Sequence, residues 1–157
     1  MPTFLESFFG SLSAQCDGPA SSEHDLQLAT AALLIEMMRA DNAVGADEID
    51  AVRHALQHEF ALDEAELDAL IEHATAEARD APGYFAFTRR INEALPLARK
   101  LRLMEYLWRV ALADGHLAAH ENHLMRKLAD LIHIGHGDYH AAKARARSYL
   151  EAKGQTV

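Results

Sequence analysis

The chain reads LIEMMRADNAVGADEIDAVRHAL at residues 34–56 and LWRVALADGHLAAHENHLMRKLA at residues 107–129. Shifted by 73 positions, the two stretches are identical at six of their 23 positions. Each has an Ala-Asp pair at the end of one helical pattern and a glutamate seven residues after the aspartate. We therefore predict two equivalent helix–loop–helix junctions, related by an internal pseudo-two-fold axis. The identical pairs are Leu34/Leu107, Ala40/Ala113, Asp41/Asp114, Ala46/Ala119, Glu48/Glu121 and Arg53/Arg126.

The acidic residues of the two junctions are candidate metal ligands. Asp41 and Asp114 close a helical pattern, and Glu48 and Glu121 fall in the first turn of the next one. Carboxylate and carbonyl oxygens gathered at a turn suit hard divalent cations, which favours Mg²⁺ or Ca²⁺ and leaves Zn²⁺ possible. A structural role is also open, because such glutamates complement the helix dipole and such aspartates stabilise turns.

These junctions resemble the duplicated signature of the TerB-like tellurite-resistance family. The matching segments are Ala40–Val44 leading to Glu48 and Ala113–Leu117 leading to Glu121, and the first departs by having Asn42 where the second has glycine. The resemblance covers roughly residues 25–150. It implies a compact α-helical, cytoplasmic bacterial protein with clustered acidic residues as divalent-metal ligands. It also implies a link to tellurite or general chemical-stress resistance.

The whole chain predicts an all-α fold. Ala, Leu, Glu and Arg dominate, and no segment alternates with the period of a strand. We expect a short N-terminal helix and linker over 1–22, then one compact helical domain over 23–157, with about seven or eight helices in total. The N-terminal helix is expected at about 4–15, and the others at about 23–41, 46–59, 63–79, 84–94, 96–113, 119–132 and 138–152. Asp63 with Glu66 forms a capping-box pattern, and Asp138 is the expected cap of the last helix.

The charge is distributed unevenly along the chain. Residues 1–78 hold 16 acidic and 2 basic side chains, whereas residues 79–157 hold 8 acidic and 13 basic ones. Such a division indicates an acidic and a basic face, either of which could bind a protein partner, or two halves that attract each other. The acidic half argues against nucleic acid as the partner. The oligomeric state is left open.

The sequence also indicates where the protein works. One cysteine, Cys16, excludes a disulfide framework and fits the reducing cytoplasm. No apolar run has the length of a membrane span, so any membrane association would be indirect.

Histidines are concentrated late in the chain, with six of the ten between residues 116 and 140. His116 and His120 flank the second junction, so a transition-metal site is conceivable there. His120 and His123 lack the four-residue spacing of zinc proteases, and the first junction has no matching histidines. Ordinary exposed or core-edge histidines are the favoured interpretation.

These observations favour a non-enzymatic metal-binding domain. The alternative is a helical protein–protein interaction adaptor in which the Asp and Glu residues are purely structural caps. A metal-dependent hydrolase ranks third, because the sequence has no catalytic-triad spacing and no phosphate-binding loop.

Overall fold

The computed structural model describes residues 19–40, 45–81, 83–115, 117 and 119–154, and this part of the chain is all-α. It forms seven helices and no strand, which confirms the predicted fold class. The helix expected at 4–15 lies outside the described residues. The helices are α2 (Pro19–Arg39), α3 (Ala46–Phe60), α4 (Glu64–Asp80), α5 (Phe85–Ala94), α6 (Leu97–Ala111), α7 (Ala119–Leu131) and α8 (His136–Ala152).

Local sequence signals explain some of the helix ends. The capping box at α4 is confirmed: the Glu66 N–H donates to Asp63 Oδ1 at 2.8 Å, and the Asp63 N–H donates to Glu66 Oε1 at 3.3 Å. Helix α2 begins at Pro19, earlier than expected, because proline fits the first helical position. The expected cap at Asp138 is wrong. Gly135 is the extended residue before α8, so Asp138 lies inside its first turn.

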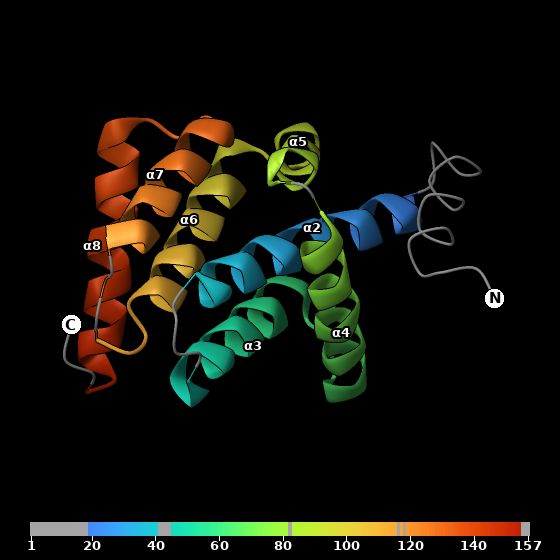
Figure 1. Cartoon of the computed structure of the whole chain (residues 1–157), viewed down its shortest axis with the longest axis horizontal. Helices are drawn as coiled ribbons and strands as arrows, with labels where there is room; N and C mark the ends of the chain where they lie inside the picture. The colour runs from blue at the N-terminus through green and yellow to red at the C-terminus, as the bar shows by residue number, and fades with distance from the viewer. Residues whose placement is uncertain (1–18, 41–44, 82, 116, 118, 155–157) are drawn as a thin grey trace.

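Helix α2 occupies the centre of the fold. It contacts α3, α4, α5, α6 and α7, while α8 packs on the outer side of α6 (Figure 1). The side chains of residues 31–35 are all buried, so this helix has no solvent-facing side over that stretch. A helix that is apolar all round is stable in water only when other elements surround it. The remaining helices therefore assemble around α2.

The two helices that lead into the junctions, α2 and α6, pack against each other, as the repeat predicts. The pseudo-two-fold relation between the junctions stays a prediction.

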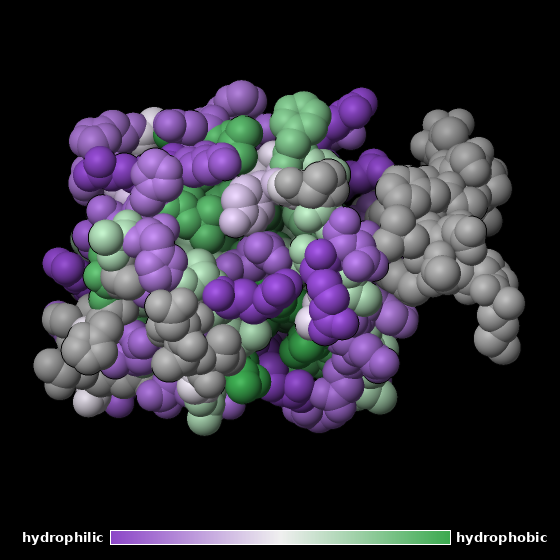
Figure 2. Space-filling view, in the orientation of Figure 1, coloured by the Kyte–Doolittle hydropathy of each residue, from purple (hydrophilic) through white to green (hydrophobic). Residues whose placement is uncertain are grey.

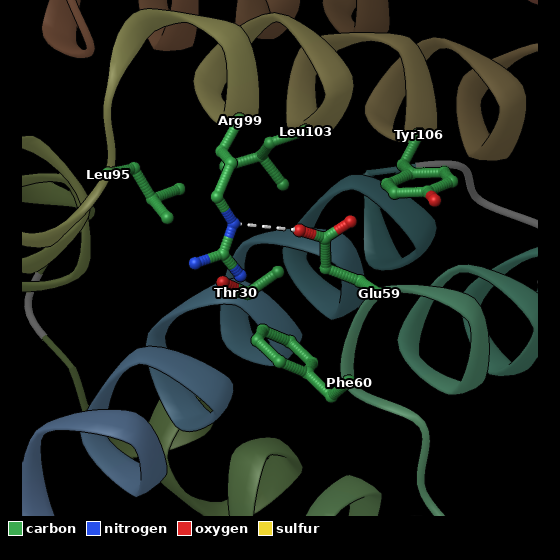
Figure 3. A pocket seen from close by; sticks show the side chains of 7 residues that line it. All are labelled: Thr30, Glu59, Phe60, Leu95, Arg99, Leu103 and Tyr106. Atoms are coloured by element: carbon green, nitrogen blue, oxygen red, sulfur yellow. Dashed lines mark hydrogen bonds and ion pairs between the residues drawn. The ribbon is translucent and has the colours of Figure 1, made fainter. Parts of the chain in front are cut away.

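The acidic and basic halves of the chain are joined by ion pairs. The side chain of Glu59 on α3 is 8% exposed and accepts a hydrogen bond from Arg99 Nε at 3.1 Å (Figure 3). It accepts a second one from Arg102 Nε at 2.8 Å, and both arginines lie on α6. Asp25 on α2 pairs with Arg90 on α5 at 3.4 Å. The halves therefore attract each other at contacts between helices, which is one of the two arrangements that the charge division suggests.

The space beside Glu59 is too small for a ligand. Its volume is about 10 Å³, and Thr30, Phe60 and Tyr106 line it together with the ion pair (Figure 3). A volume of that size holds roughly one water molecule. This region therefore has a structural role.

The visible surface is mainly hydrophilic (Figure 2). Among the described residues, the large hydrophobic side chains that are exposed are Ile49, Phe85 and Leu97, which belong to three different helices. Among the helices that the structure describes, none combines the length and the apolar character needed to cross a membrane.

We predict that Glu59→Gln lowers the free energy of unfolding by about 1–3 kcal/mol, because hydrogen bonds to two charged groups are weakened in a buried position. Urea denaturation measures this change. Glu93→Gln is the control, since Glu93 is 53% exposed and pairs with Arg89 within α5; an exposed pair contributes about 0.5 kcal/mol or less. Equal effects of the two substitutions would contradict the structural role assigned to Glu59.

Candidate functional site

The two junctions meet in space. The first connects α2 to α3, and the second connects α6 to α7. His120, in the first turn of α7, donates a hydrogen bond from Nε2 to the backbone carbonyl of Ala40, which follows α2. Two segments that are 80 residues apart in the sequence are thus in contact, at the end of α2 and at the start of α7.

The glutamate of each junction is buried. Glu48 is the third residue of α3, Glu121 is the third residue of α7, and each is 2% exposed. Glutamate is rarely buried to this degree unless it is paired. The two candidate ligands therefore occupy equivalent helix positions and the same kind of interior environment.

Glu66 provides a comparison within the same chain. It is also the third residue of its helix, α4, and its carboxylate completes the capping box with Asp63. Glu66 is nevertheless exposed. Capping at this position therefore requires no burial, and the burial of Glu48 and Glu121 comes from the packing of the helices around them.

The aspartates lie nearer the surface or outside the described residues. Asp114 is exposed and follows the end of α6. The next residue, Gly115, has φ 82°, and its N–H donates to the Leu112 carbonyl at 3.0 Å, as expected for a sharp helix exit. A carboxylate near a helix C-terminus is electrostatically disfavoured, because that end of the helix carries a partial negative charge. Asp41 lies outside the described residues.

The described residues do not form a complete metal-binding cluster. In that part of the chain, no three histidine, cysteine, aspartate or glutamate side chains gather closely enough to hold a metal ion. The structure thus places Glu48 and Glu121 in the interior of two adjoining junctions and leaves Asp114 at the surface.

The histidines of the second junction are placed differently from one another. Both His120 and His123 are exposed, but His120 also contacts the backbone of the first junction. His116 lies outside the described residues. Sequence reasoning missed the contact between His120 and Ala40, because no local pattern signals a bond between residues so far apart in the chain.

A family model described as "Tellurite resistance protein TerB" matches residues 27–144, which include both junctions. The chain belongs to the TerB family. No curated protein and no solved structure matches it. The TerB match begins within α2 and ends within α8, so it includes helices α3 to α7 in full.

We predict that His120→Ala lowers the free energy of unfolding of this TerB domain by about 0.5–1.5 kcal/mol, the usual contribution of one internal hydrogen bond. His123→Ala is a matched control, because it removes an exposed histidine from the same helix and should change stability by about 0.5 kcal/mol or less. Chemical denaturation of both variants measures the difference. If both variants lose the same free energy of unfolding, the contact between His120 and Ala40 does not stabilise the two junctions.

Proposed function

We propose that this TerB-family protein binds a divalent cation at its paired junctions and that this binding supports resistance to tellurite or related chemical stress. Binding alone is proposed, with no catalysed reaction. The observation that carries the proposal is the burial of Glu48 and Glu121 at equivalent positions of two helices whose junctions are in contact.

Electrostatics supports this proposal. Removing a carboxylate from water costs several kcal/mol after relaxation of the protein. The structure has two glutamates in this condition, whereas Glu66 at the same helical position remains exposed. A divalent cation would attract both of these carboxylates, and it would also attract the Asp114 carboxylate beyond the C-terminal end of α6.

The donor types define the class of cation. The proposed ligands are Asp41, Glu48, Asp114 and Glu121, which offer only carboxylate oxygens. Such donors suit Mg²⁺, Ca²⁺ and Mn²⁺ better than softer ions. Zn²⁺ is the less favoured choice, because the nearby His120 already uses Nε2 in its contact with Ala40. When bound, the cation would supply positive charge and connect the starts of α3 and α7.

The biological part of the proposal rests on family membership. The TerB family model carries tellurite resistance in its description. We place the protein in the bacterial cytoplasm, where its single cysteine would remain reduced.

Metal titration tests the binding. We expect thermal stability to rise with added Mg²⁺, Ca²⁺ or Mn²⁺, because a cation that binds only the folded state adds about 2.7 kcal/mol at a hundredfold excess over Kd. Differential scanning calorimetry of chelator-treated protein measures this change. Asp114→Asn and Glu121→Gln should abolish the rise, and the equivalent changes at Asp41 and Glu48 should have a smaller effect.

The matched control is Glu66→Gln, which alters a glutamate at the same helical position outside the junctions and should retain the full metal response. The outcome that contradicts the proposal is a wild-type protein whose melting temperature does not change with Mg²⁺, Ca²⁺, Mn²⁺ or Zn²⁺. The adaptor function, with the acidic residues as structural caps, would then replace metal binding.

The stress-resistance part has a separate test. Bacteria that express the native chain should grow at higher tellurite concentrations than bacteria that express Glu121→Gln, while Glu66→Gln should behave as native. Equal growth of all three strains, with equal protein levels, would show that the junction residues do not contribute to tellurite resistance.

A further inference from the structure

Two histidines at the start of α8 direct their ring nitrogens at each other. His136 and His140 are four residues apart, and their Nε2 atoms are separated by 3.1 Å. Both side chains are exposed. We infer that this His136–His140 pair is a binding site for a borderline transition-metal ion of the Ni²⁺, Cu²⁺ and Zn²⁺ class. The pair is separate from the carboxylates of the junctions.

The distance between the nitrogens fits two ligands of one metal ion. Imidazole nitrogens bind Zn²⁺ at about 2.0–2.1 Å, so two of them at angles between octahedral and tetrahedral values lie about 2.9–3.4 Å apart. The observed 3.1 Å falls within this interval. Residues four apart on a helix share one face, which is why paired histidines at this spacing recur in helical metal sites.

Tyr139 restricts both rings. Its side chain is buried and lies against Trp108, with ring centroids 5.2 Å apart. The His136 ring is stacked near the Tyr139 ring at 6.4 Å, and the His140 ring meets it edge-on at 5.1 Å. Because the tyrosine is anchored in the core, its ring limits the positions that the two imidazoles can take on this side. Preorganisation of this kind increases affinity.

The surroundings leave room for the other ligands of the ion. A hollow of about 280 Å³ lies beside His136, lined also by Arg126, Asp130 and Tyr139. Among the described residues, no third histidine, cysteine or carboxylate completes the group, so water would fill the remaining positions. Arg126 and the positive N-terminal end of α8 oppose a cation, while Asp130 favours it. We therefore expect a moderate-affinity site from which the ion exchanges readily.

A hydrogen bond between the two neutral imidazoles is the alternative explanation of the short distance. One Nε2–H then donates to the other ring, and a metal ion binds the pair only by displacing this proton.

The test uses the full chain, stripped of metal with a chelator, and Ni²⁺ as the probe. Isothermal titration calorimetry at slightly alkaline pH should show saturable Ni²⁺ binding. His136→Gln and His140→Gln should each weaken it at least about tenfold, because even the loss of an outer-shell partner of a metal ligand costs that much. His123→Gln, which removes an exposed histidine from α7, should leave the affinity within about twofold of native. Melting temperatures without metal check that all variants are folded.

Paramagnetic Cu²⁺ then locates the site independently of mutation. Amide NMR signals of residues 136–143 should broaden first in the native chain. Broadening centred on His120 and His123 would overturn the assignment, as would a His140→Gln variant that keeps native Ni²⁺ affinity, or a His123→Gln variant that loses as much as His140→Gln. The Mg²⁺ and Ca²⁺ responses of the junction variants are measured separately, so failure of one site is distinguishable from failure of the other.

Discussion

The constraint on which the structure depends is the apolar character of α2 on every side. Its residues 31–35 are buried without interruption, so water must be excluded around its whole circumference. Five other helices provide this cover. Because α6 is one of them, the C-terminal ends of α2 and α6 are followed by turns close enough for His120 to bind the Ala40 carbonyl. The burial of one hydrophobic helix thus brings together two junctions that are distant in the sequence.

Ion pairs between helices make the packing of this hydrophobic assembly more specific. Apolar contacts are non-directional, whereas the ion pairs of Glu59 with Arg99 and Arg102 connect defined positions of α3 and α6. Burial of Glu59 strengthens its hydrogen bonds and raises the cost of mispairing. The opposite charges of the two halves of the chain therefore help to select one arrangement of the helices around α2.

The two proposed metal sites differ in chemistry because their donors differ. The junctions offer carboxylate oxygens on interior helix starts, which suit hard cations. The His136–His140 pair offers imidazole nitrogens on the surface of α8, which suit borderline ions. Tellurite resistance in the family description gives a context for the first site, and the second is argued from the geometry of this chain alone.

The sequence by itself determined the features that depend on near neighbours. Helix periodicity and the capping box of Asp63 with Glu66 involve residues three or four apart, so the all-α class and most helix positions could be read directly. The duplicated junction motif also pointed to the TerB family, which the family model confirms. The start of α8 was misjudged, because Gly135 and Asp138 are both acceptable caps and local signals do not rank them.

Only the tertiary structure decided which of these residues are buried and which face one another. Glu48, Glu66 and Glu121 hold the same position in their helices, yet only the two junction glutamates are buried. Likewise, the four-residue spacing of His136 and His140 is visible in the sequence, whereas only the structure shows that their Nε2 atoms lie 3.1 Å apart beside the buried Tyr139. The burial of a side chain depends on contacts between helices that are far apart in the chain. Such contacts cannot be recognised from a local sequence pattern.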